Sequence, residues 1–160
     1  MTKTNAARAL DQLSISYELR DYTVDVDDLS AGAVAAKIGM PLAQVWKTLL
    51  VKGEGKHLGF ALLPGDAELD LKAYARLAGV KSAELAPLKE VQPLTGYIRG
   101  GVTALAAKRA YPVFVDDAFL MHDHVSVSAG VRGTQLILAP ADYVRATGAK
   151  LGPLARGAPR

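Results

Sequence analysis

The chain has 160 residues, of which half are hydrophobic and 22% are charged, and its net charge is +3. These values fit one globular domain with a buried core and exclude an intrinsically disordered chain. The charge permits a nucleic-acid partner without requiring one, because a domain that coats phosphates is usually more basic.

The chain contains no cysteine. This excludes disulfides, thiol nucleophiles and cysteine-based metal sites, and it is compatible with a reducing cytoplasm. No segment approaches the roughly 18 apolar residues of a membrane span. The N-terminal residues carry charges and no long apolar run, so they are not a signal peptide. We therefore expect a cytoplasmic protein without a membrane partner.

The first half of the chain predicts helices and strands in alternation. Ala7, Leu10 and Leu13 share one face of an amphipathic helix. Ser30 is a suitable N-cap for a second helix that Gly39 would end. Two apolar runs separated by a short glycine-containing turn predict a hairpin. The predicted elements are helix 4–13, strand 15–22, helix 31–38, a turn at 40–44, strands 45–53 and 57–65, and helix 69–79.

The second half predicts mostly strands. Its predicted elements are strand 81–84, a turn or helix from Pro87, strands 96–102, 112–117, 124–130 and 134–140, and helix 141–148. Residues 151–160 contain proline, glycine and arginine without periodicity, so we expect a flexible C-terminal tail. About seven strands, interrupted by helices at irregular intervals, favour an α+β domain with a mixed or curled sheet over a Rossmann fold.

The histidines do not predict a metal site. His57 falls in the hairpin turn, whereas His122 and His124 share one face of a strand and could form a metal-ligand pair. No third ligand is indicated, so ordinary surface histidines are the simpler interpretation. A serine triad has no support either, because the chain lacks a G-x-S-x-G elbow.

Lys47 and two glycine-rich loops are the features that suggest a pocket. Lys47 lies between Trp46 and the apolar run TLLV, where its charge needs either a pocket with an anion or a path to solvent. Gly100 and Gly101 could form a phosphate nest, a bulge or a turn. The loop VSAGVRG (127–133) could be a second tight loop or a simple hairpin. These features together suggest a pocket lined mainly by backbone, but they do not name a reaction.

The order of these pieces resembles the YbaK/EbsC family of aminoacyl-tRNA deacylases, which is related to the editing domain of prolyl-tRNA synthetases. The resemblance extends over about residues 4–150. It is carried by TNAARALD, QVWKTLLV (44–51), AELDLK (67–72), PLTGYIRGG (93–101), the Lys108-Arg109 pair before PVFVD, and VSVSAGVRGTQLILAPADYV (125–144).

The resemblance implies a single domain, residues 1–150, built on a curved, mostly antiparallel mixed sheet flanked by helices. It implies trans-editing of mischarged tRNA, above all Cys-tRNA(Pro), with no metal or cofactor, because the substrate thiol attacks its own carbonyl. The partners would be the tRNA acceptor end and, as an option, prolyl-tRNA synthetase, but not DNA. The catalytic positions would be Lys47, Gly100 and Gly101, and the substrate-binding positions Tyr22, Ser30, Thr48, Thr103, Ser128, Gly130, Arg132 and Gln135.

Three departures from the family pattern bear on specificity. The loop reads GGVTALAA, with Thr103, Ala104 and Ala106 where the family commonly has serine, proline and glycine. Gln135 replaces an acidic residue, and Ser30 replaces a phenylalanine of some members. We expect a different loop path, helical through TALAAKR, and a shifted choice of amino acid. Two alternatives stay open: a deacylase for another small amino acid such as alanine, and a non-catalytic module that binds the acceptor end or a synthetase.

Overall fold

Short polar side chains begin three of the helices. The computed structural model describes residues 3–156. Thr4, Ser30 and Asp70 each accept a hydrogen bond from a first-turn N–H of the helix that follows, which satisfies a donor that the helix cannot pair itself. The helices are α1 (Asn5–Gln12), α2 (Ala31–Ile38), α3 (Leu71–Ala78), α4 (Leu88–Thr95) and α5 (Pro140–Thr147), with 3₁₀ turns η1 (Leu42–Gln44) and η2 (Asp117–Met121).

The strands belong to three hydrogen-bonded sheets. They are β1 (Glu18–Asp21), β2 (Trp46–Gly53), β3 (Leu58–Pro64), β4 (Glu68–Leu69), β5 (Ala83–Leu85), β6 (Val113–Asp116), β7 (Val125–Ser128), β8 (Thr134–Leu138), β9 (Lys150–Gly152) and β10 (Ala155–Arg156). The largest sheet has the order β5-β2-β3-β6-β9, the second β1-β8-β7, and the third pairs β10 with β4. A bridge between Val45 and Ser126 joins the first two sheets.

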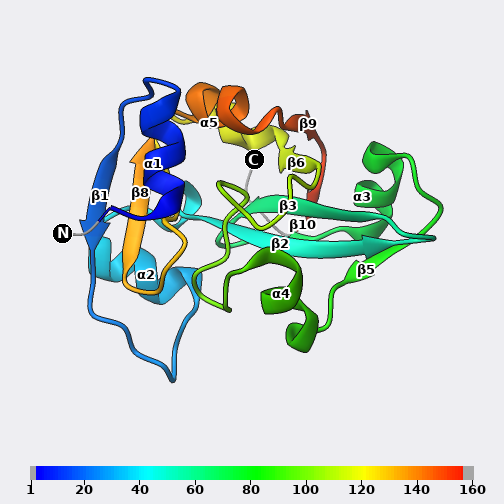
Figure 1. Ribbon diagram of the computed structural model, residues 1–160, viewed down its shortest axis with the longest axis horizontal. Helices are drawn as coiled ribbons and strands as arrows, with labels where there is room; N and C mark the ends of the chain where they lie inside the picture. Colours follow the sequence, from blue (N-terminus) through cyan, green and yellow to red (C-terminus); the bar gives the residue numbers. More distant parts are fainter. Residues whose placement is uncertain (1–2, 157–160) are drawn as a thin grey trace.

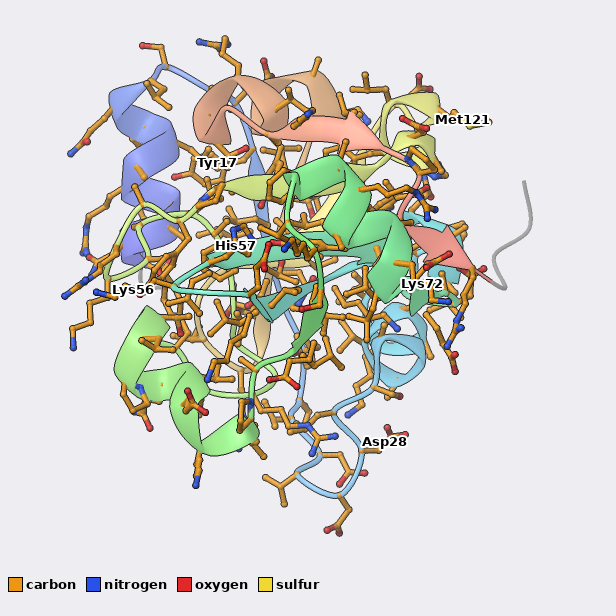
Figure 2. All side chains as sticks on the ribbon, turned by 90° about the vertical axis from the view of Figure 1, so that its right-hand side faces the viewer. Tyr17, Asp28, Lys56, His57, Lys72 and Met121 are labelled. Carbon is orange, nitrogen blue, oxygen red and sulfur yellow. The ribbon has the colours of Figure 1, made fainter. Side chains whose placement is uncertain are left out.

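The β2–β3 hairpin connects the two ends of the molecule. In Figure 1, α1, α2 and the β1-β8-β7 sheet lie at one end, and the hairpin extends from there to α3 and β5 at the other. Helices α5 and α4 lie on opposite sides of the hairpin. The loop between β1 and α2 projects from the body, with Asp28 near its tip (Figure 2).

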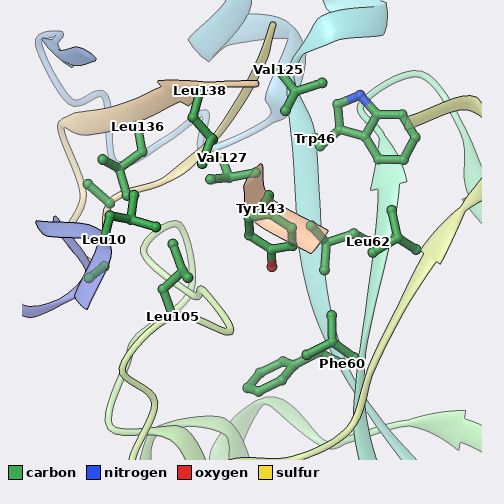
Figure 3. Packing of buried hydrophobic residues seen from close by; sticks show 14 of the residues in the cluster. Leu10, Trp46, Phe60, Leu62, Leu105, Val125, Val127, Leu136, Leu138 and Tyr143 are labelled. Atoms are coloured by element: carbon green, nitrogen blue, oxygen red, sulfur yellow. The ribbon is translucent and has the colours of Figure 1, made fainter. Parts of the chain in front are cut away.

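β3 is buried on both faces, which is why its sequence reads as a continuous apolar run. Phe60 and Leu62 belong to the main core cluster, in which α1, β7, β8 and α5 meet. Tyr143 of α5 lies in the middle of this cluster, between Leu62 and Val127 (Figure 3). On the other face of β3, Leu63 packs with Tyr74 beneath α3 in a second cluster. The β2–β3 hairpin therefore separates two hydrophobic cores.

These features confirm the expected α+β class and the single domain with a mixed, mostly antiparallel sheet and flanking helices. Within residues 3–156, β3–β6 and β6–β9 are the only parallel pairs of strands, and the isolated Val45–Ser126 bridge is also parallel. The strands are divided among three sheets, whereas we expected one curved sheet. None of the helices in this range is long and apolar enough to cross a membrane.

The strand expected at 96–102 is absent, because this segment folds back on itself as a loop. No strand or helix occurs between residues 96 and 112, so the helix expected through TALAAKR is absent too. The Tyr97 hydroxyl hydrogen-bonds the carbonyls of Leu105 (2.6 Å) and Ala106 (3.0 Å). The Gly101 N–H donates to the Ile98 carbonyl at 2.8 Å. These contacts turn the chain where local β-propensity favours an extended strand.

The expectation of a flexible tail is wrong for residues 151–156. β9 extends the main sheet beside β6, and β10 pairs with β4. Leu154 between them is fully buried. Buried Asp116 accepts hydrogen bonds from the N–H groups of Leu154 (2.9 Å) and Ala155 (2.8 Å). Residues 157–160 of the expected tail lie outside the described residues.

Candidate active site

A cavity of about 540 Å³ opens beside the first half of β2. The lining comes from five regions of the chain. They are Leu29, Ser30, Ala31, Gly32 and Val34 at the start of α2; residues 45–50 and Gly65; Leu85, Ala86, Leu88 and Val91; Arg99, Gly100 and Val102; and Ser128 and Gln135 of the second sheet. The segments that form it are far apart in sequence. Of the predicted site residues, Lys47, Gly100, Ser30, Thr48, Ser128 and Gln135 line this cavity.

β2 presents an unpaired edge to the cavity. β5 pairs only with the last three residues of β2, and the Val45–Ser126 bridge lies directly before β2, so among the described residues the stretch 47–49 has a strand partner only on the β3 side. The Gly53 N–H donates to the His57 carbonyl on the β3 side, and the Ala86 N–H donates to the Leu50 carbonyl on the opposite side. Because these directions alternate along a strand, the main-chain N–H and C=O of Thr48 point to the open side. A ligand could therefore bind to this edge through its own polar groups.

Three neutral side chains add hydrogen-bonding groups to the cavity. The Thr48 hydroxyl is buried and has no partner among residues 3–156. The Ser128 Oγ accepts from the Gly130 N–H at 3.1 Å, so its proton remains available to donate. The Gln135 Oε1 accepts from the Ser126 hydroxyl at 2.7 Å. That bond leaves the amide N–H groups of Gln135 as its free donors.

Lys47 lines the cavity and carries its charge into a partly dehydrated position. Burial lowers the pKa of Lys47, and the negative charges of Glu68 and Asp66 oppose that shift. Within the described chain, Lys47 makes no ion pair. Successive side chains of a strand leave it on opposite faces, but the cavity follows the strand edge, so Lys47 and Thr48 both reach it.

Gly100 and Gly101 have different surroundings. Gly100 lines the cavity with φ at +87°, a conformation that favours glycine. Gly101 does not line it. A side chain at position 101 would come within 3.2 Å of the backbone of Val131 and Arg132, and the Gly101 N–H is used by Ile98. The Gly101 N–H is therefore not free to donate to a ligand in the cavity.

Four other predicted substrate-binding residues do not line the cavity. Tyr22 packs against the cluster around α2. Thr103 is fully buried, and its hydroxyl accepts from the Leu105 N–H at 3.2 Å within the loop. A side chain at Gly130 would come within 2.9 Å of Tyr97. Arg132 lies beside Gly100, with its Nε donating to the Arg99 carbonyl at 2.8 Å.

Sequence reasoning missed the apolar wall of the cavity and Arg99. Leu85, Leu88 and Val91 come from the end of β5 and one face of α4. Their signal was the i, i+3 spacing of Leu88 and Val91, which puts both on one side of a helix. Arg99 lines the cavity directly before the glycine pair.

The histidine pair shows no sign of a metal site. Among residues 3–156, no group of three or more His, Asp or Glu side chains is arranged to hold a metal ion. The His122 ring lies 6.4 Å from the Trp46 ring, edge to face, and His124 is exposed.

Comparison with known proteins gives a consistent family. A sequence profile described as "Aminoacyl-tRNA editing domain" matches residues 26–146. EbsC of Enterococcus faecalis, named as a candidate Cys-tRNA(Pro)/Cys-tRNA(Cys) deacylase, is 37% identical over 86% of this chain and 84% of its own. The multifunctional Ser/Thr-tRNA deacylase ProXp-y of Escherichia coli K12 is 33% identical over 71% of this chain and 70% of its own.

The fold agrees with this assignment. The crystal structure of a candidate trans-editing enzyme for prolyl-tRNA synthetase superposes with a TM-score of 0.84 at 25% identity, covering 98% of this chain and all of the other. The structure of the hypothetical protein APE2540 gives a TM-score of 0.88 at 25% identity, covering 96% of this chain and all of the other. The chain therefore belongs to the aminoacyl-tRNA editing domain family, whose named relatives here are aminoacyl-tRNA deacylases.

Proposed function

We propose that this chain is a trans-editing deacylase that hydrolyses mischarged tRNA in the cytoplasm, with Cys-tRNA(Pro) as its principal substrate. The observation that carries the proposal is the cavity beside β2, which offers main-chain groups, hydroxyls, an amide and Lys47 but no carboxylate or thiol. Such a site can hold and polarise an ester, but its lining contains no histidine or carboxylate that would activate one of its hydroxyls as a nucleophile. The two named deacylase relatives support the reaction class.

A substrate that carries its own nucleophile fits this site. The cysteinyl sulfur would attack the ester carbonyl, forming a C–S bond, while the C–O bond to the terminal ribose breaks and that oxygen takes the thiol proton. A cyclic thioester leaves and is then hydrolysed by water. The protein contributes position and electrostatics, which can supply several kcal/mol of the barrier.

The residues of the cavity have separate roles in this proposal. Gly100 lines the cavity and its N–H has no partner among the described residues, so this N–H can donate to the oxyanion that develops on the carbonyl. Lys47 would orient the ribose end of the substrate. Thr48, Ser128 and Gln135 would surround the amino-acid side chain, which must be small because the cavity also has to hold the terminal nucleoside.

A second candidate substrate class follows from the same polar side chains. Thr48, Ser128 and Gln135 can hydrogen-bond a hydroxyl as readily as a thiol. The relative from Escherichia coli is named for seryl and threonyl substrates. A deacylase for Ser-tRNA or for another small amino acid is therefore the alternative, and a non-catalytic module that binds the acceptor end is the alternative of another class.

The test is a deacylation assay with purified protein on cysteinyl-, seryl-, threonyl-, alanyl- and prolyl-tRNA. We expect Cys-tRNA(Pro) to be cleared fastest, and a chelator to leave the rate unchanged. Lys47→Ala should lower kcat/KM by about 10²-fold, as losing an oriented polar group does, with an unchanged melting temperature. Lys72→Ala, on the exposed face of α3, is the matched control. Loss of all five activities with retained binding of uncharged tRNA would establish the non-catalytic alternative.

A further inference from the structure

Arg99 lines the cavity, and the side chain of Arg132 binds to its main chain. The Arg132 Nε donates to the Arg99 carbonyl at 2.8 Å. The stem of Arg132 covers Gly100, since a side chain at position 100 would lie 3.4 Å from its Cγ and Nε. Arg99 itself lines the cavity. The structure therefore fixes the Arg132 guanidinium on the main chain of Arg99, directly next to the glycine whose backbone faces the cavity.

Neither arginine is neutralised within the described part of the chain. No ion pair involves Arg99 or Arg132. The anchoring bond uses one of the five N–H donors of Arg132, and the side chain of Arg99 makes no hydrogen bond to residues 3–156. Most of the donors of this pair are thus available to a ligand.

The surroundings of the pair are depleted of acidic groups. The chain has no aspartate or glutamate between Glu90 and Asp116, a stretch that includes the whole loop around Arg99. The cavity lining contains Lys47 and Arg99 but no carboxylate. The acidic run 25–28 ends directly before Leu29, which lines the cavity beside Gly100. However, among the described residues none of the carboxylates of this run forms an ion pair with Arg99 or Arg132, and Asp28 lies on the loop that projects from the body (Figure 2). The electrostatic character of the rim therefore favours an anion.

We propose that Arg99 and Arg132 form a phosphate-binding pair that holds the sugar-phosphate backbone of the tRNA acceptor end at the cavity rim. The assignment rests on the proposed function, which puts the terminal aminoacyl ribose inside the cavity. A phosphate lies within one nucleotide of that ribose, so the backbone must leave the cavity across its rim. Guanidinium groups match phosphate oxygens in charge and in the spacing of their donors.

The bond between the two arginines also gives the pair a positioning role. The Arg132 side chain is hydrogen-bonded to the carbonyl that directly precedes Gly100. A phosphate bound by Arg132 is therefore held at a fixed position relative to the loop that faces the ester. Binding energy from the phosphate, which does not react, would thereby align the reacting carbonyl with the Gly100 N–H.

The test compares two probes that differ in phosphate, the trinucleotide CpCpA and the nucleoside adenosine, by titration against wild type, Arg99→Gln and Arg132→Gln. We expect each substitution to raise the Kd for CpCpA about fivefold to tenfold and to leave the Kd for adenosine unchanged. The slope of log Kd against log salt should decrease by about 0.7 for each phosphate contact removed from a single strand. Arg76→Gln removes the same charge from α3, which does not line the cavity, and should change neither Kd.

The outcomes separate this inference from the proposed function. Unchanged binding of CpCpA by both variants overturns the phosphate-binding pair, whatever the wild type does to aminoacyl-tRNA. Equal weakening of adenosine and CpCpA also overturns it, because the arginines would then act on the loop and not on phosphate. Because the Arg99 side chain is exposed, Arg99→Gln should leave the fold intact, and a change in its Kd for CpCpA cannot be attributed to misfolding. A wild type that binds CpCpA through these arginines but deacylates no tRNA refutes the proposed function alone.

Discussion

Gly100 and Gly101 are neighbours whose backbones approach different parts of the molecule. Gly100 faces the cavity, whereas Gly101 packs against the backbone of Val131 and Arg132. The first glycine leaves room for a ligand, and the second lets two loops come together. A glycine pair thus joins the candidate active site to the loop that carries Arg132.

His57 makes the stability of the protein depend on pH. Its Nε2 lies 2.8 Å from the Tyr74 hydroxyl under α3, and burial lowers the pKa of His57. A lowered pKa means that the folded state favours neutral imidazole. The unfolded chain binds this proton more readily, so folding stability is full above the unfolded pKa of about 6.5 and is lost as pH falls below it.

We therefore expect the free energy of unfolding of wild type to decrease between pH 7.5 and pH 5, with a smaller decrease in His57→Gln. Urea titrations of both proteins across this range measure the difference, and glutamine does not titrate but can still pair with Tyr74. His124, which is exposed, supplies the control His124→Gln with a wild-type profile. Identical pH profiles for wild type and His57→Gln would contradict the assignment.

The loop between α4 and β6 keeps a conformation that its sequence disfavours. Ala106 has a φ of +53°, a region that costs an alanine about 1–2 kcal/mol. The Tyr97 hydroxyl hydrogen-bonds the carbonyls of Leu105 and Ala106, and Leu105 is buried in the main core. These contacts hold the loop on a left-handed path, where the family commonly has glycine, in place of the helix that its alanines favour.

Ala106→Gly should consequently raise the free energy of unfolding by about 0.5–1 kcal/mol, because relief of strain exceeds the added freedom of the unfolded chain. The adjacent Ala107→Gly is the control, because Ala107 does not have a positive φ. This substitution should lower the free energy of unfolding by about 0.5–1 kcal/mol. Urea unfolding of wild type, Ala106→Gly and Ala107→Gly measures both changes in the free energy of unfolding. Destabilisation by Ala106→Gly equal to that of Ala107→Gly would show that the loop is not strained. Deacylation rates of the same variants test whether the loop influences substrate choice.

At the scale of the whole molecule, Asp116 connects the main sheet to the C-terminal segment. It ends β6, is fully buried, and accepts hydrogen bonds from three N–H groups: those of Ala118, Leu154 and Ala155. β10 in turn pairs with β4, the strand that leads into α3. The last described residues therefore close the second core beneath α3.

Asp116→Asn should lower the free energy of unfolding by about 2–3 kcal/mol, because the amide cannot accept at both atoms and weakens bonds made to a charged group. Asp117→Asn makes the same carboxylate-to-amide change at an exposed neighbouring residue. Its free energy of unfolding should be within about 0.5 kcal/mol of wild type. Urea unfolding measures both, and hydrogen exchange at residues 150–156 reports local release. Wild-type protection of that segment in Asp116→Asn would rule out the anchoring role.

Elements whose signals are local could be predicted from the sequence. The Ser30 cap and the left-handed Gly39 fix the two ends of α2, and the hairpin of β2 and β3 follows from two apolar runs and a turn. The strand expected around Tyr97 does not form, because the Tyr97 hydroxyl bonds the carbonyl of Leu105, eight residues further on, and folds the segment back as a loop. Local β-propensity does not contain this contact. The ordered β9 and β10 were missed because their short sequences carry no periodicity, and their stability comes from β6, β4 and Asp116.

The sequence by itself determined the α+β class, the helix ends and the family resemblance, because these depend on periodicity, capping and motif order along the chain. It also singled out Lys47, Gly100 and Ser128. Only the tertiary structure decided which residues share the cavity, because Lys47, Gly100 and Ser128 come from segments that meet only when β2 leaves an open edge between the two sheets. It also decided that Gly100 faces the cavity while Gly101 packs against the backbone of Val131 and Arg132. The hydrogen bond from the Arg132 Nε to the Arg99 carbonyl likewise forms only in the folded chain. Contacts between segments distant in sequence leave no periodic signal, so no local pattern could have revealed them.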